Sequence, residues 1–137
     1  MPDSRPHSVA PPGSLRGRDL ISAADLTPAD VRRVYATAAD FKAEFAARRR
    51  HSRPPLVRRT LAMLFDRPSL RTRVTFEAGM VQLGGSAIQL TSGDVGWGVR
   101  ESIADVARNL DGFVDAIVIR TGPHDVAVEF AARAAIP

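Results

Sequence analysis

Hydroxyl and guanidinium side chains are crowded into one short segment, Ser69 to Arg73, just behind an apolar run that ends at Phe65. Ser69 suits the N-cap position, so the segment predicts the first turn of a helix. Such a turn has free N–H groups and partial positive charge, Arg71 offers a planar fork for phosphate oxygens, and Thr72 can donate a hydroxyl hydrogen. These groups favour an oxyanion site, most naturally for phosphate; a plain helix cap with surface arginines is the alternative.

A second guanidinium, Arg120, follows another apolar run and precedes the turn Thr121–Pro123. In an open parallel sheet, ligands bind beyond the carboxyl ends of the strands. Arg120 would therefore converge on the same anion if its strand lay beside the strand that ends at Phe65. A surface arginine leaving a strand is the alternative.

Other residues that could do chemistry carry weaker signals. His7, His51 and His124 lack the spacing of a metal pair, so we expect each at the surface and no metal site. Glu77 and Asp105 are not arranged as a pair for general acid–base work. The chain has no cysteine, which excludes disulfides and thiolate ligands.

The elements that must position these residues alternate along the chain. The pattern predicts strands at 60–65, 86–91 and 115–119, and helices at 27–47, from Ser69 to the glycines 84–85, over 103–110 and over about 124–134. A glycine-punctuated loop, 92–100, carries Trp97, which could pack or close over a ligand. Strand and helix in alternation specify an α/β domain of three layers with a mostly parallel sheet.

The ends and connectors of this domain have their own composition. Residues 1–14 hold four of the ten prolines and few apolar residues, which predicts a disordered tail ahead of a domain at 15–137. The stretch 48–55 combines a basic run with two prolines, and is predicted to be a solvated connector.

Composition narrows the class of protein. The chain has 137 residues, of which 45% are hydrophobic and 25% charged, a balance that fits one domain with a core. Its apolar runs fall short of the roughly 18 residues that cross a bilayer, and no secretory signal is visible, so we expect a cytoplasmic protein without a membrane. The net charge of +4 comes from 18 Arg and Lys42 spread among 15 acids, with one Trp and one Tyr, which does not favour nucleic-acid binding.

The segment Ser69–Glu77 resembles the Ser-x-Arg-Thr-Arg-x-Ser/Thr-Phe-Glu signature of aspartate and ornithine carbamoyltransferases. Residues 79–85, 100–108 and 117–121 look like successive segments of the same family in the right order, and 15–26 looks like its opening. The resemblance covers about 15–137, and the ornithine branch is favoured by 80–85 and 101–108.

The resemblance implies transfer of a carbamoyl group from carbamoyl phosphate to an amine, without metal or organic cofactor. The acceptor would be ornithine, giving citrulline in arginine biosynthesis, with aspartate or another amine as the alternative. Carried over by motif, Arg71 and Arg120 would be catalytic, and Ser69, Leu70, Thr72 and both arginines would bind carbamoyl phosphate. The family fold has two α/β domains and forms a homotrimer.

Two features depart from the family pattern. The loop that reaches a neighbouring subunit's site corresponds to 94–101, where Gly96 replaces a common glutamine, Val99 replaces a common basic residue, and Arg100 can supply the charge. After Pro137 the family would continue into a His-Pro-x-Gln segment and an acceptor-binding domain. We therefore expect a truncated chain, inactive alone, or, from a different class, a non-catalytic phosphate-binding module.

Overall fold

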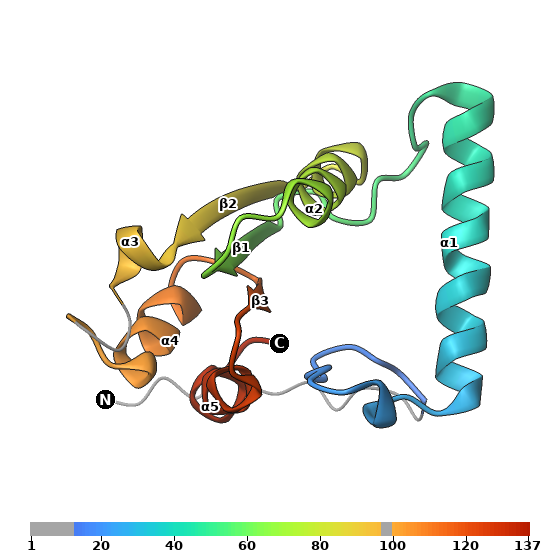
Figure 1. The fold of residues 1–137 in the computed structure, drawn as a ribbon. Coiled ribbons are helices and arrows are strands. Elements are labelled where there is room, and N and C mark those ends of the chain that lie inside the picture. Colours follow the sequence, from blue (N-terminus) through green and yellow to red (C-terminus); the bar gives the residue numbers. More distant parts are fainter. Residues whose placement is uncertain (1–12, 97–99) are drawn as a thin grey trace.

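Three parallel strands form the centre of the fold in a computed structural model that describes residues 13–96 and 100–137 (Figure 1). The strands are β1 (Thr60–Phe65), β2 (Ser86–Thr91) and β3 (Ala116–Arg120). Their order in the sheet is β2-β1-β3, so β1 lies in the middle. Phe65, the last residue of β1, pairs with the last residue of each neighbour, Thr91 and Arg120. All three strands therefore end at the same edge of the sheet.

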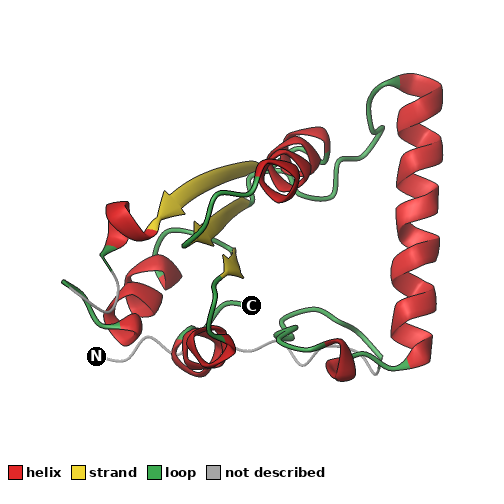
Figure 2. Cartoon of the chain, in the orientation of Figure 1, coloured by secondary structure: helices red, strands yellow, loops and turns green. Residues whose placement is uncertain are grey.

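Helices connect the strands and cover both faces of the sheet. These helices are α2 (Leu70–Gln82), α3 (Ser92–Val95), α4 (Ile103–Asp111) and α5 (His124–Arg133). Ahead of the sheet come the 3-10 turn η1 (Ala23–Asp25) and helix α1 (Pro28–Arg48). Figure 2 shows α2 on one side of the sheet, with α4 and α5 on the other. The three-layer α/β architecture predicted from the sequence is confirmed.

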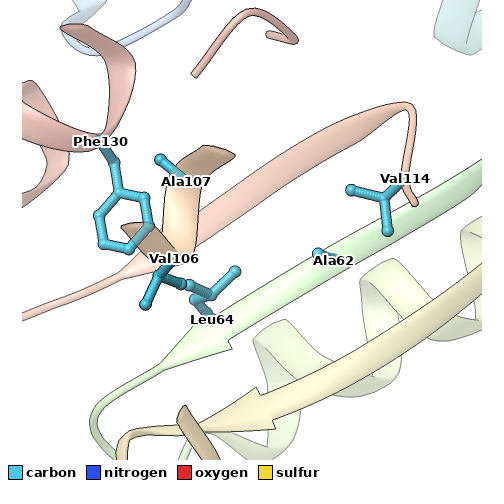
Figure 3. Packing of buried hydrophobic residues seen from close by; sticks show 6 residues of the cluster. All are labelled: Ala62, Leu64, Val106, Ala107, Val114 and Phe130. Carbon is cyan, nitrogen blue, oxygen red and sulfur yellow. The ribbon is translucent and has the colours of Figure 1, made fainter. Parts of the chain in front are cut away.

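The core depends on the alternation of side chains along β1. Leu61, Met63 and Phe65 are buried on the side of α2, where Met80 packs against them. Ala62 and Leu64 point to the other side and pack against residues of α4, α5 and the turn before β3: Val106, Ala107, Val114 and Phe130 (Figure 3). Because both faces of β1 are covered, every residue from Leu61 to Phe65 is at most 6% exposed. A continuous apolar run is what such a strand requires.

The predicted element boundaries agree closely with the structure. The strands at 60–65 and 86–91 match to the residue, and β3 lies one residue later than predicted. The first helix begins at Pro28 because Thr27 and Asp30 form a capping box. The loop predicted for 92–100 differs, since its first four residues form α3.

Helix α1 stands apart from the sheet (Figure 1). Apolar side chains of this helix are largely exposed in this chain: Val34 is 46% exposed and Tyr35 is 73% exposed. The one buried residue of α1 is Asp30, whose carboxylate accepts hydrogen bonds from Thr27. No helix in the described part of the chain has the length and apolar character needed to span a membrane.

The prediction that His51 lies at the surface is wrong. Its ring is buried, with an edge-to-face contact to Phe41 at 5.3 Å between centroids and a second contact to Phe45. Nδ1 lies 2.8 Å from Oε2 of Glu44, and Glu44 also accepts bonds from the N–H and hydroxyl of Ser52. The chain folds back after α1, at Arg49 in the left-handed region, and this brings the ring onto the helix. The connector 48–55 is thus solvated at its arginines but not at His51.

Candidate functional site

The candidate site lies at the edge where the three strands end. Ligands of open parallel sheets bind beyond this edge, since the loops and helix N-termini that follow the strands point there. Helix α2 begins at Leu70, five residues after the end of β1, and the turn after β3 begins next to it in the sheet. In the order β2-β1-β3, the strand of Arg120 lies beside the strand that ends at Phe65. Arg120 and the Ser69–Thr72 turn therefore lie at the same edge of the sheet.

The first turn of α2 has no side-chain cap. Ser69 occupies the N-cap position, but its hydroxyl does not accept a bond from the helix backbone. Instead Oγ of Ser69 donates to Oγ1 of Thr72 at 2.8 Å. The expected serine cap is therefore wrong in its hydrogen bond, though right in its position. The consequence is that N–H groups at the start of a 13-residue helix remain without a capping side chain, a suitable arrangement for an anion.

The arginines of this turn differ in their partners. Arg73 forms an ion pair with Glu77 one turn later, with 3.3 Å between Nε and Oε2. Arg71 is exposed and has no ion-pair partner in the described part of the chain. Leu70, the first residue of α2, is 79% exposed. Its side chain is apolar, so only its backbone N–H can donate a hydrogen bond to an anion. Arg71 is the free guanidinium of the turn.

Arg120 is the last residue of β3 and lies opposite Phe65. Alternation along β3 places Ala116 and Val118 on the side of α2, and Arg120 follows them on that side. Its side chain is exposed and forms no ion pair with any residue that the structure describes. Two free guanidiniums, Arg71 and Arg120, therefore belong to the same edge and the same face of the sheet.

The free edge of β3 borders a groove of about 720 Å³. Arg120 and Thr121 line it at the end of the strand, and the segment Arg18–Ile21 and helix α5 line it further along. The Arg120 side of the candidate site thus opens onto a hollow large enough for a small molecule.

Asp66 follows β1 directly and is a residue of the candidate site that the sequence pattern did not mark out. Its Oδ2 accepts bonds from the N–H of Gly122 at 2.8 Å and from the hydroxyl of Thr121 at 3.3 Å. Its own N–H donates to the carbonyl of Arg120. The one available signal was an acid directly after a buried strand, and its partners, 55 and 56 residues away, carry no local pattern.

Comparison with known proteins identifies the family. Residues 18–137 match the family described as "Aspartate/ornithine carbamoyltransferase, carbamoyl-P binding domain". The chain belongs to this family. Similar curated proteins include the ornithine carbamoyltransferases of Anoxybacillus flavithermus, 45% identical over 123 residues, and Bacillus subtilis, 44% identical over 124 residues. Each alignment covers 90% of this chain but only 38% and 37% of the relative, so the chain spans less than two fifths of their length.

Solved structures of the carbamoyltransferase family agree with the fold. The ornithine carbamoyltransferase from Pyrococcus furiosus superposes with a TM-score of 0.86 at 40% identity, over 90% of this chain and 39% of that one. An aspartate transcarbamoylase from Trypanosoma cruzi in complex with phosphate superposes with a TM-score of 0.77 at 28% identity, over 90% and 38% of the two chains. The three-stranded sheet and its helices are therefore the N-terminal part of a carbamoyltransferase fold.

The loop after β2 in this carbamoyltransferase domain begins with α3. Thr91 and Asp94 form its capping box, and hydrogen bonds from the hydroxyl and the N–H of Thr91 lower the pKa of Asp94. Gly96 ends α3 with φ of 69°, and Arg100 packs so closely that a Cβ at Gly96 would lie 2.5 Å from its Nε. The guanidinium of Arg100 donates to the carbonyls of Gly93 and Asp94, so it is held within its own loop. Trp97 and Val99 lie outside the described residues.

The acids and histidines do not form a second centre. Glu77 pairs with Arg73 on α2, whereas Asp105 accepts bonds from Ser102 and Arg108 on α4, on the other side of the sheet. His124 begins α5 and is exposed. Among residues 13–96 and 100–137, His, Asp and Glu side chains form no group of three that could hold a metal ion.

Proposed function

We propose that this chain binds carbamoyl phosphate at the strand-end edge and is the donor-binding part of a carbamoyltransferase. The observation that carries the proposal is the pairing of two free guanidiniums, Arg71 and Arg120, with the uncapped first turn of α2, in a domain of the carbamoyl-phosphate-binding family. Phosphate is a doubly charged oxyanion, and guanidinium forks with helix N–H groups bind it well.

The proposed roles follow from the groups present. The backbone N–H groups from Ser69 to Thr72, with the hydroxyls of Ser69 and Thr72, hold the phosphate, and Arg71 neutralises it. Arg120 approaches from the neighbouring strand and reaches the phosphate and the carbonyl side. Orienting the donor in this way can lower a transfer barrier by several kcal/mol, up to about 7–11 kcal/mol in well-oriented systems.

The reaction is nucleophilic transfer at the carbamoyl carbon. A neutral amine attacks this carbon, negative charge develops on the carbonyl oxygen, and donors directed at that oxygen stabilise it. The bond between the carbon and the phosphate oxygen then breaks, inorganic phosphate leaves on the arginines, and the amine nitrogen loses a proton. The chain's own residues supply binding and electrostatic stabilisation, and no residue described here is placed as the proton acceptor.

Ornithine is the acceptor that the relatives support best, which makes citrulline the product. The curated relatives at 44–45% identity are named ornithine carbamoyltransferases, whereas an aspartate enzyme appears among the structures at 28% identity. Aspartate is the alternative. A place in arginine biosynthesis, a homotrimer, a cytoplasmic location and an acceptor domain beyond this chain stay predictions from the sequence and the family resemblance.

The loop around Gly96 and Arg100 is proposed to contact a neighbouring subunit's site, as the family resemblance implies. The close fit of Arg100 over Gly96 gives this loop a defined shape in the single chain. To bind phosphate in a neighbouring subunit's site, Arg100 would have to break its hydrogen bonds to the carbonyls of Gly93 and Asp94 and donate to the phosphate oxygens instead.

Titration of the purified chain with inorganic phosphate and with carbamoyl phosphate tests the proposal. Arg71→Ala and Arg120→Ala should each weaken binding by about tenfold or more, since a hydrogen bond to a charged group contributes roughly 1.5–3 kcal/mol. Arg108→Ala is the matched control, because Arg108 is an exposed helix arginine on the other side of the sheet, paired with Asp105. Equal affinities for all four proteins would refute the site.

A transfer assay separates the enzyme from a binding module. The chain is incubated with carbamoyl phosphate and either ornithine or aspartate, and the carbamoylated product is measured. Product formation that Arg71→Ala abolishes would support catalysis by this chain. Binding of carbamoyl phosphate without product would favour a binding part that depends on further residues for transfer.

A further inference from the structure

Asp66 joins the two halves of the candidate site. It is the first residue after β1, on the segment that leads to the Ser69–Thr72 turn. Its Oδ2 accepts from the N–H of Gly122 at 2.8 Å and from the hydroxyl of Thr121 at 3.3 Å, both in the turn that follows Arg120. Its N–H donates to the carbonyl of Arg120 at 3.1 Å. One residue thus holds the Arg120 turn from both its backbone and its side chain.

The packing around this carboxylate leaves little freedom. The Asp66 side chain is 21% exposed, and its other oxygen, Oδ1, is buried without a hydrogen-bond partner, with Nε of Arg67 4.0 Å away. The guanidinium of Arg67 lies over Gly122, where a Cβ would come within 2.6 Å of its nitrogen. The backbone of the turn can approach Asp66 and Arg67 this closely because position 122 has no side chain.

A second carboxylate forms a similar connection at the opposite edge of the sheet. Asp115 precedes β3, and its Oδ2 accepts from the N–H of Thr60 at 2.9 Å while its Oδ1 pairs with Arg59. The hydrogen bond from Thr60 and the charge of Arg59 lower the pKa of Asp115. Asp115 thus links β1 to β3 where the strands begin, far from the candidate anion site, whereas Asp66 links them where they end.

We infer that Asp66 is a positioning residue for anion binding: its carboxylate fixes the Arg120 turn relative to the Arg71 turn, so that the two guanidiniums are held ready for one phosphate group. The inference rests on the proposed function and adds a residue that does not itself touch the anion. Preorganised groups bind better because less reordering accompanies binding. If the carboxylate only stabilised the fold, its removal would lower the free energy of unfolding without a selective loss of affinity for the anion.

The test compares Asp66→Ala with Asp115→Ala in the 137-residue chain, with inorganic phosphate as the probe. Asp66→Ala should weaken phosphate binding by about tenfold or more, the loss typical when the partner that orients a ligand-binding residue is removed. Asp66→Asn keeps an acceptor for Gly122 and should stay within about threefold of the unsubstituted chain. Asp115→Ala should lower the melting temperature but leave phosphate affinity unchanged.

A double-mutant cycle identifies the residue through which Asp66 acts. If Asp66 positions Arg120, then Asp66→Ala should cause no further loss of affinity in the Arg120→Ala background but should still weaken binding in the Arg71→Ala background. The same loss in both backgrounds would show a general structural effect and overturn the inference.

The remaining outcomes are also decisive. Unchanged phosphate affinity in Asp66→Ala, with losses in Arg71→Ala and Arg120→Ala, would overturn the positioning role and leave the proposed function standing. No phosphate binding by the unsubstituted chain would overturn the proposed function and the positioning role together. If Asp66→Ala does not fold, Thr121→Val removes one donor to Oδ2 and should weaken binding by about threefold; no change would contradict the inference.

Discussion

Pairing with acids separates the arginines of this chain into two groups. Five arginines have a carboxylate within 4.0 Å: Arg18, Arg59, Arg67, Arg73 and Arg108. Arg71 and Arg120 have no such partner in the described part of the chain, and both belong to the edge where the strands end. The phosphate of the proposed ligand would supply the negative charge that both guanidiniums lack.

Glu44 gives a pH-dependent prediction. Bonds from the side chain and backbone of Ser52, and from His51, lower its pKa from 4.5 to about 2. A carboxyl group with a depressed pKa stabilises the folded state above its unfolded pKa, and this stabilisation is lost as the pH falls through the folded pKa. Glu44→Gln should therefore weaken the fold-back of residues 49–52 at pH 7, and the difference from the unsubstituted chain should vanish between about pH 4.5 and pH 2.

Urea titrations at several pH values measure this effect. In each titration, NMR monitors the contacts of the Phe41 and Phe45 rings with the ring of His51. Asp40→Asn is the control, since Asp40 is an exposed acid one turn earlier on α1. A constant difference between Glu44→Gln and the unsubstituted chain from pH 7 to pH 2 would refute the assignment.

Residues with distant partners were the hardest to predict from the sequence. Four of the five candidate anion ligands, Ser69 to Thr72, stand together in one nine-residue signature, so their types and order were readable, and Arg120 follows a separate apolar run. His51 sits in a basic run that suggests solvent, and its burial depends on Glu44, Phe41 and Phe45 of the preceding helix. The role of Asp66 depends on contacts with Thr121 and Gly122, which only the parallel pairing of β1 and β3 brings near.

The strands were predictable because β1 and β3 are short apolar runs with polar ends, and because the residues of β2 alternate. For β1 the run Leu61–Phe65 is buried on both faces, which is the environment that a continuous apolar run requires. Helix α3 was missed because four residues give no periodicity, although Thr91 and Asp94 have the spacing of a capping box. The serine cap of α2 was predicted in the right place, but the Ser69 hydroxyl bonds Thr72 instead.

Leu64 tests the central strand. It is fully buried and packs in the cluster that joins β1 to α4 and α5. Leu64→Ala should lower the free energy of unfolding by about 2–5 kcal/mol, because it loses buried methyl groups and leaves a cavity. Denaturant unfolding followed by far-ultraviolet circular dichroism measures the change. Val81→Ala, on the exposed face of α2, is the control and should cost less than about 1 kcal/mol; similar losses for both would contradict the two-sided core.

The molecule as a whole consists of a layered body and one projecting helix. The two core clusters and the residues packed against them come from the three strands, α2, α3, α4, α5 and nearby turns, and include no residue of α1. At its ends, α1 is joined to the flanking segments by the ion pair of Arg18 with Asp30 and by the contacts of His51 with Glu44, Phe41 and Phe45. The proposed anion site takes its residues from the strand-end edge and none from α1.

Unequal stability of these two parts is the expected consequence. Amide hydrogens of β1 should exchange only when the sheet unfolds, whereas those of α1 should exchange through opening of the helix alone, because a helix without tertiary burial is marginal in water. Hydrogen–deuterium exchange resolved by residue should thus show faster exchange over 31–42 than over 61–65. Val34→Ala, at a half-exposed site of α1, should leave protection of β1 unchanged, and Leu64→Ala should reduce it. Equal protection of α1 and β1 would mean that the helix and the sheet unfold as one unit. That result would contradict the prediction that α1 is less stable than the layered body.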